Sequence, residues 1–188
     1  LANAAAEKGL NLAEIETRLT ELQNSKAENP EEYWGNATYP EIIDHILVRY
    51  HQRHREQLQE LIVLADRVES VHGDREDCPI GVAAELRNVY EDLSNHMMKE
   101  EHVLFPMIKA GNYMMAQMPI RMMEMEHAEH GEHLEVLKSL TNNMTPPADA
   151  CNTWRALYSG IQEFADDLMM HIHRENNVLF PRVIAENH

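Results

Sequence analysis

Two stretches of eleven residues contain side chains that could bind a metal ion. They run from His96 to Pro106 and from His171 to Pro181, and both have the pattern H-x-x-x-E-x-x-V-L-F-P. In a helix, residues four apart lie on the same face, about 6 Å apart at Cβ. Each stretch therefore points one imidazole and one carboxylate, Glu100 or Glu175, in the same direction. The second stretch begins 75 residues after the first, so the same arrangement occurs twice.

Two histidine pairs that precede these stretches show the same duplication. His51-Gln-Arg-His54 matches His127-Ala-Glu-His130 at an offset of 76 residues. The duplicated unit covers about residues 51–106 and 127–181, and each copy is long enough for a pair of helices. Two antiparallel helix pairs packed face to face form a four-helix bundle. We therefore predict an all-α fold, a four-helix up-down bundle built from a duplicated helix pair.

The spacing of apolar residues locates the four helices. We expect the first from the capping pattern at 38–41 to about Val71, and the second from Val82 to a stop near Gly111, with a kink at Pro106. The third is expected from 118–119 to before Thr141, and the fourth after the loop that ends at Pro147. Residues 1–24 indicate one or two short helices, followed by a polar linker over 24–34. The twelve methionines are expected mainly as core residues.

The composition excludes several classes of partner. The chain has 188 residues, enough for one domain with a small appendage, and 32 acidic against 16 basic residues give a net charge of −16. Such a chain repels nucleic acid and anionic membranes and attracts cations. No run of 18 apolar residues occurs, so we expect no membrane span. Two cysteines, Cys78 and Cys151, argue against a disulfide framework and favour a reducing compartment, so we expect a cytoplasmic protein.

The buried imidazoles and carboxylates point to a pair of metal ions. A buried carboxylate without compensation costs several kcal/mol, and a bound cation removes that cost. Four imidazoles and two carboxylates are too many for one tetrahedral zinc but suit two ions bridged by Glu100 and Glu175, with a shared oxo or hydroxo group. The residues alone do not choose between His51 with His127 and their neighbours His54 with His130.

Three segments resemble a known family: Ile42–Leu58, His96–Lys109 and Glu175–Pro181. They are similar to the hemerythrin-like (HHE) di-iron domain and, within it, to the bacterial repair-of-iron-centres proteins, over about residues 40–183. The resemblance implies a site with two iron ions and these ligands: His51, His96, Glu100, His127, His171 and Glu175. It also implies that residues 1–36 are the remnant of a small N-terminal helical domain plus a linker, and that residues 37–188 are the di-iron bundle.

The resemblance further implies a function in repairing iron–sulfur clusters after nitrosative or oxidative stress, by donating iron or handling NO. Its partners would be iron–sulfur proteins and the small ligands NO or O₂, with no nucleic acid and no membrane, and the chain would act as a monomer or dimer. The alternative is a hemerythrin-like protein that binds, stores or senses O₂ or NO without repair. A structural zinc site is a third interpretation. A ferritin-like ferroxidase is disfavoured because its ligands are rich in Glu and follow E-x-x-H.

Three acidic residues lie next to the predicted ligands. Asp92 and Asp167 precede His96 and His171 by one turn, and Glu126 adjoins His127. We expect them to hold the ligands from outside the site or to form an exit path for iron and protons, the alternative being a solvated acidic face. The other side chains near the pattern are expected to be exposed: His45, His72, His102, His133, His173, His188, Lys99, Glu101 and Arg174.

Overall fold

The structure is a computed structural model that describes residues 30–186. The chain divides into two compact units, with the division between Thr38 and Tyr39. The first unit contains the short helix α3 (Pro30–Asn36), which begins inside the segment expected as a linker. The short helices expected in residues 1–24 lie outside the described residues. The domain boundary expected between residues 36 and 37 stays a prediction.

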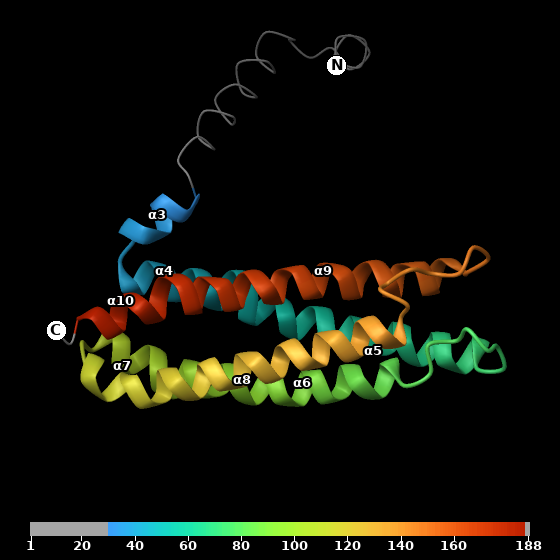
Figure 1. Ribbon diagram of the computed structural model, residues 1–188, viewed down its shortest axis with the longest axis horizontal. Coiled ribbons are helices and arrows are strands. Elements are labelled where there is room, and N and C mark those ends of the chain that lie inside the picture. Colours follow the sequence, from blue (N-terminus) through green and yellow to red (C-terminus); the bar gives the residue numbers. More distant parts are fainter. Residues whose placement is uncertain (1–29, 187–188) are drawn as a thin grey trace, which may run out of the picture. The chain divides into compact units, whose positions relative to one another are not determined.

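The second unit consists of four long helices that lie side by side (Figure 1). The first comprises α4 (Tyr39–Ile46), the π-helical turn η1 (Leu47–His51) and α5 (Gln52–His72); the second comprises α6 (Val82–Lys99), η2 (Glu100–Leu104) and α7 (Phe105–Lys109). The third is α8 (Tyr113–Leu140), and the fourth comprises α9 (Asn152–Arg174), η3 (Glu175–Leu179) and α10 (Phe180–Ala185).

These helices pack in the order expected of a duplicated hairpin. Helix α5 contacts α6 and α9, and α8 contacts α6 and α9, which closes a ring of four. The regular secondary structure of residues 30–186 is entirely helical and includes no strand, so the prediction of an all-α four-helix bundle is confirmed. No helix within the described part of the chain is long and apolar enough to cross a membrane.

Three of the four bundle helices contain a π-helical turn at a residue of the duplicated pattern. The turn η1 ends at His51, while η2 and η3 begin at Glu100 and Glu175. In the last two, the N–H of the phenylalanine after the turn donates to the carbonyl of the glutamate five residues earlier. The next residue in each case is a proline, which has no N–H to continue the usual ladder. The sequence led us to expect a kink at Pro106, and the structure has a widened turn just before it.

The third helix begins at Tyr113, earlier than expected. Gly111, with a φ of +74°, ends the preceding helix, and the Asn112 carbonyl accepts the N–H groups of Met115 and Ala116. This turn fixes the helix start, and Pro119 therefore lies inside α8.

The expectation that the methionines fill the core is wrong for most of them. Met97 and Met123 are buried, whereas eight others are exposed: Met98, Met114, Met115, Met118, Met122, Met125, Met169 and Met170. Five of these eight lie on α8, and their spacing puts them on the face roughly opposite its buried residues Ala116, Ile120 and Met123.

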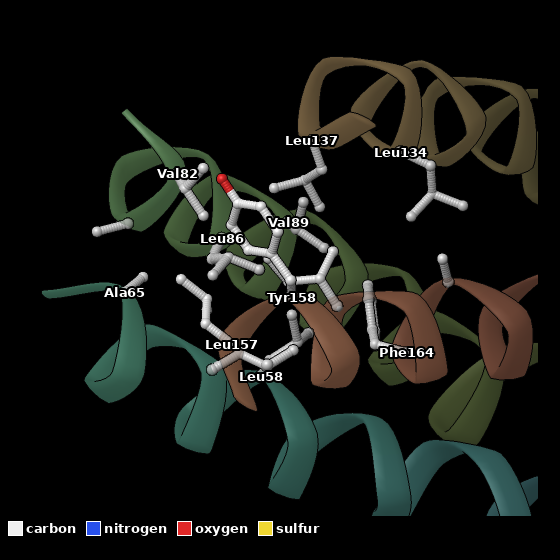
Figure 2. Packing of buried hydrophobic residues seen from close by; sticks show 14 of the residues in the cluster. Leu58, Ala65, Val82, Leu86, Val89, Leu134, Leu137, Leu157, Tyr158 and Phe164 are labelled. Atoms are coloured by element: carbon white, nitrogen blue, oxygen red, sulfur yellow. The ribbon is translucent and has the colours of Figure 1, made fainter. Parts of the chain in front are cut away.

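The buried apolar residues form two layers along the bundle. The larger one, here called the apolar cluster, joins α5, α6, α8 and α9, and includes Leu58, Leu86, Leu134, Leu157 and Phe164 (Figure 2). The second layer lies toward the other ends of the same helices and includes the following buried side chains: Ile43, Ile46, Phe105, Ile108, Ile120 and Phe180. The antiparallel helices place the residues of the duplicated pattern between the two layers, where water is excluded.

Candidate metal centre

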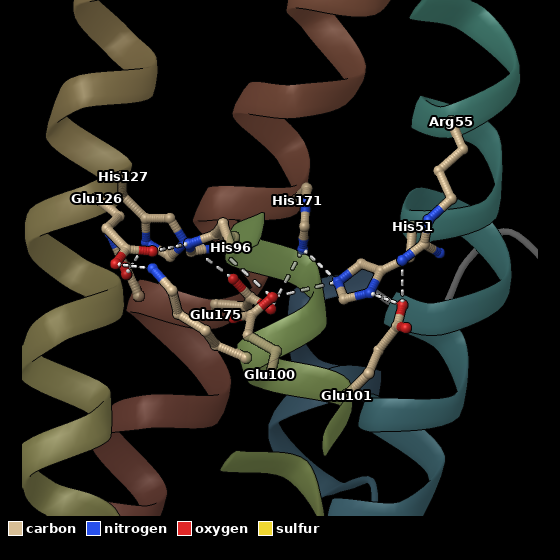
Figure 3. A network of polar contacts seen from close by, with 11 residues as sticks. His51, Arg55, His96, Glu100, Glu101, Glu126, His127, His171 and Glu175 are labelled. Carbon is tan, nitrogen blue, oxygen red and sulfur yellow. Dashed lines mark hydrogen bonds and ion pairs between the residues drawn. The ribbon is translucent and has the colours of Figure 1, made fainter. Parts of the chain in front are cut away.

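Six ionisable side chains from all four bundle helices meet between the two apolar layers (Figure 3). None is more than 4 % exposed. The structure thus brings together all six residues that the resemblance implies as ligands: His51, His96, Glu100, His127, His171 and Glu175.

The six side chains form two groups that share Glu100 and Glu175. The first group, here called position A, adds His51 and His171, and the second, position B, adds His96 and His127. Within each group, one nitrogen or oxygen atom per residue lies within 4.8 Å of the others. The Nε2 atoms of the two histidines are 3.2 Å apart in both positions. Each position therefore offers two imidazole nitrogens that converge on the same point.

Both carboxylates reach both positions. Glu100 Oε2 lies 3.3 Å from His51 Nε2 and 3.4 Å from His96 Nε2. Glu175 Oε1 lies 3.2 Å from His171 Nε2, and its Oε2 lies 3.0 Å from His127 Nε2. This is the arrangement that a carboxylate needs in order to be shared between two neighbouring ions.

Carboxylates outside the six hold one histidine of each position. His51 Nδ1–H donates to Glu101 Oε1 at 2.8 Å, and the same oxygen accepts from Arg55 at 2.8 Å. His96 Nδ1–H donates to Glu126 Oε2 at 3.0 Å. A proton on Nδ1 leaves the lone pair on Nε2, which is the form of imidazole that binds metal.

The remaining two histidines have different surroundings. His127 Nδ1–H donates to the amide oxygen of Asn176 at 2.9 Å. His171 Nδ1 has no hydrogen-bond partner among residues 30–186. Sequence reasoning missed Asn176 and placed Glu101 on the solvated face, which the contact with His51 contradicts. The available signal was position, since each of these residues directly follows a glutamate of the pattern.

The three acidic residues expected near the ligands have different contacts. Glu126 bonds to His96, as described above. Asp92 instead accepts a hydrogen bond from His133, and its side chain is 57 % exposed. Asp167 accepts from Arg49 at 2.6 Å and from Gln57 at 3.1 Å. Within residues 30–186, Glu126 is thus the one acid of the three that hydrogen-bonds to a residue of the six.

His54 and His130 lie outside both groups, although both are buried. They sit one turn away toward the apolar cluster, where the His54 ring is 5.3 Å from the His171 ring and the His130 ring is 4.8 Å from the His96 ring. Burial lowers the pKa of His54 to about 2 and that of His130 to about 4, so both are neutral at pH 7.

The other side chains expected at the surface differ in exposure. Lys99 and His102 are exposed, four histidines are half-buried (His45, His72, His133 and His173), and His188 lies outside the described residues. Arg174 is buried, contrary to expectation, because it lies on the inner side of the last turn of α9.

Burial and mutual repulsion set the protonation of the site. Burial lowers the pKa of His51 and moves that of His96 well below its usual range. Burial, followed by the charge of Glu175, raises the pKa of Glu100 well above its usual value. Burial alone would also raise the pKa of Glu175, but His171 and His127 lower it well below the usual value. His51 and His96 are therefore neutral donors, and Glu100 retains a proton that a cation can replace.

The donor set fits a metal ion on structural grounds. Neither oxygen of Glu100 accepts a hydrogen bond, although the side chain is completely buried. Its near neighbours are the Nε2 atoms of His51 and His96. These two rings carry their proton on Nδ1, so Nε2 has no proton to donate. When Glu100 loses its proton, its lone pairs face those of the two imidazoles, and these repel one another unless a cation lies between them. Mixed nitrogen and oxygen donors suit iron, manganese or zinc.

Comparison with known proteins agrees with this geometry. Residues 42–183 match the hemerythrin HHE cation-binding domain. The chain is 68 % identical over 183 residues to a "Probable iron-sulfur cluster repair protein" of Haemophilus influenzae, covering 97 % of this chain and 82 % of the relative. It is 56 % identical over 185 residues to the "Iron-sulfur cluster repair protein YtfE" of Musicola paradisiaca, covering 98 % and 82 %. The protein of the same name from Escherichia coli O17:K52:H18 is 56 % identical over 186 residues, covering 98 % and 83 %. The chain belongs to the hemerythrin HHE cation-binding domain family.

Proposed function

We propose that positions A and B bind two iron ions, bridged by Glu100 and Glu175, and that this centre serves in the repair of iron–sulfur clusters. The observation that carries the proposal is the pair of four-residue groups that share both carboxylates. The relatives named as iron–sulfur cluster repair proteins supply the choice of metal and of process. When bound, the ions would supply exchangeable iron and a place where a small ligand such as NO can bind.

The residues of the chain suit an ion that is held and then given up. Each position has two imidazoles and one oxygen from each carboxylate, which leaves room for further ligands on an octahedral ion. A carboxylate that reaches both positions can move toward one of them without a change in the backbone. The iron–sulfur proteins that receive iron are the partners of this function, and the unpaired Cys78 and Cys151 favour a cytoplasmic location.

The three nearby acids would act in two ways. Glu126 positions His96 through its hydrogen bond. Asp92 and Asp167, which contact no histidine of the two groups directly, would attract a departing cation toward the surface. A protein in which Asp92 and Asp167 are both replaced by Leu should transfer iron to a chelator more slowly, and unchanged kinetics would exclude this role.

The test combines metal analysis with a repair assay. Purified protein should contain two irons per chain, and should restore the activity of a [4Fe–4S] enzyme whose cluster has been damaged by NO. The matched control is Glu100→Leu/Glu175→Leu, which removes both shared carboxylates and should neither hold iron nor restore activity. One zinc and no iron per chain would instead support a structural site. A stable O₂ or NO adduct without any repair would support storage or sensing, the second candidate function.

A further inference from the structure

The two halves of the bundle differ just outside the six candidate ligands. At the 76-residue offset of the duplication, Glu126 of the second half corresponds to Tyr50 of the first. Glu126 accepts the hydrogen bond of His96, whereas the Tyr50 ring stacks on His171, with centroids 5.3 Å apart and planes within 10°. The Glu126 carboxylate thus orients His96 through a hydrogen bond, whereas the corresponding histidine, His171, is covered by the face of the Tyr50 ring.

This difference makes positions A and B unequal. In position B both histidines donate to an oxygen, His96 to Glu126 at 3.0 Å and His127 to Asn176 at 2.9 Å. In position A only His51 does so, to Glu101 at 2.8 Å, because His171 Nδ1 has no partner within residues 30–186. Such a hydrogen bond orients the ring and makes its other nitrogen a stronger donor, and losing it costs about 10–100-fold in metal affinity.

We propose that position A holds its ion more weakly than position B and is the position from which iron leaves first. This inference rests on the proposed two-metal centre, and adds an order of release to it. The ion in position B, with both imidazoles held, keeps the other half of the site in place.

The surface next to position A is suited to receive a cation. A cavity of about 590 Å³ lies over η1, α5 and α9, and the side chains that line it include His45, Arg49, Glu56, Glu163 and Asp167. Two of these contact Tyr50: the Arg49 guanidinium lies 5.2 Å from the centre of its ring, and the centres of the His45 and Tyr50 rings are 5.5 Å apart with the two planes nearly perpendicular.

A single buried aromatic ring therefore contacts both an imidazole of position A and the wall of the cavity. Arg49 neutralises Asp167 at 2.6 Å, and Arg53 neutralises Glu163 at 3.0 Å. The cavity thus contains carboxylates that can exchange an arginine partner for a passing metal ion.

The test is the release of metal to an excess of a strong chelator, followed optically on protein loaded with two irons per chain. We expect two phases of one ion each. Glu101→Gln weakens the support of His51 and should accelerate the fast phase about 10–100-fold without changing the slow one. Glu126→Gln weakens the support of His96 and should accelerate the slow phase by a similar factor. A single phase that releases both ions, or an acceleration of the fast phase by Glu126→Gln, would overturn the proposal.

A second pair of variants tests the role of Tyr50. Tyr50→Glu reproduces in the first half the residue found at position 126 in the second, and should slow the fast phase. Tyr50→Leu removes the ring without supplying an acceptor and should not slow it. Circular dichroism of each metal-free variant checks the fold, and the two glutamine variants keep the test decisive if Tyr50→Glu does not fold.

The two proposals are separated by repeating the release experiment with zinc-loaded protein and comparing its result with that of the repair assay on iron-loaded protein. A chain that releases two ions in two assigned phases but restores no cluster refutes the function and leaves the order of release intact. A chain that restores clusters but releases both ions in one phase refutes the order of release alone.

Discussion

The apolar cluster and the candidate metal centre are neighbours in one bundle, and they satisfy burial in opposite ways. In the cluster, side chains such as Leu86 and Phe164 are completely buried and gain about 1.5–3 kcal/mol each from leaving water. In the centre, Glu100 is equally buried but accepts no hydrogen bond, and it keeps its proton because a charge in that state would cost several kcal/mol. The cluster therefore stabilises the fold unaided, whereas the centre opposes folding until a cation binds. Fold and site are separable, and variants can address them one at a time.

The largest effect on the centre is expected from Glu100→Leu/Glu175→Leu. The double variant should bind no metal, because each position loses both of its oxygens. In the metal-free state it should be as stable as the metal-free native chain or more stable by about 1–4 kcal/mol, since buried carboxyl groups are replaced by apolar groups of similar size. Urea unfolding followed by circular dichroism, with metal analysis, checks both statements. A variant that is much less stable than the metal-free native chain would show that the carboxylates support the fold directly.

The converse experiment is Leu86→Ala in the apolar cluster. This change should lower the free energy of unfolding by about 2–5 kcal/mol, because it leaves a cavity in a closely packed layer. The folded variant should still bind two ions. Val63→Ala on the exposed face of α5 is the matched control, with an expected change within about 0.5 kcal/mol. Loss of metal from folded Leu86→Ala would mean that the two regions are coupled.

His54 lies at the border between the two regions and gives a smaller effect. Its Nε2 has no hydrogen-bond partner within the described residues, and burial keeps the ring neutral. His54→Leu should leave the metal content at two per chain and change the stability by less than about 1.5 kcal/mol. His51→Leu, one turn earlier on the same helix, should lose the ion of position A. Loss of an ion from His54→Leu would assign His54 to the centre instead of the border.

The sequence predicts some residues of this site but not the contacts that depend on packing. The spacing of four residues and the duplicated frame predict His96, Glu100, His171 and Glu175 whatever the details of packing. The choice of His51 and His127 over their neighbours His54 and His130 came from the resemblance to a known family. Glu101 could not be placed in this way. An ordinary helix rotates it by 100° from Glu100, toward solvent, but the π-helical turn η2 rotates it less and brings it to His51 on another helix. The stacking of Tyr50 on His171 likewise joins residues 121 positions apart, and depends on how the first and fourth bundle helices pack.

The smallest effect concerns His133, a titrating group outside both regions. Its Nδ1 lies 2.6 Å from Glu85 and its Nε2 lies 3.0 Å from Asp92. Burial lowers its pKa, but the two carboxylates outweigh burial, so the pKa is raised above the usual value near 6.5. The stability that this contact adds is therefore fully present below about pH 6.5 and is lost as the pH rises through the raised value.

His133→Gln should accordingly lower the stability at pH 6 by no more than about 1 kcal/mol, because the ion pair is partly exposed, and should have little effect at pH 9. Urea unfolding at the two pH values measures this difference. The comparison should be made in the Glu100→Leu/Glu175→Leu background, where the carboxyl protons of the metal centre no longer contribute. A loss that is equal at both pH values would show that His133 acts by packing alone. A loss confined to acidic pH would show that, outside the metal centre, this bundle holds a charged histidine by pairing it with carboxylates instead of by binding a cation.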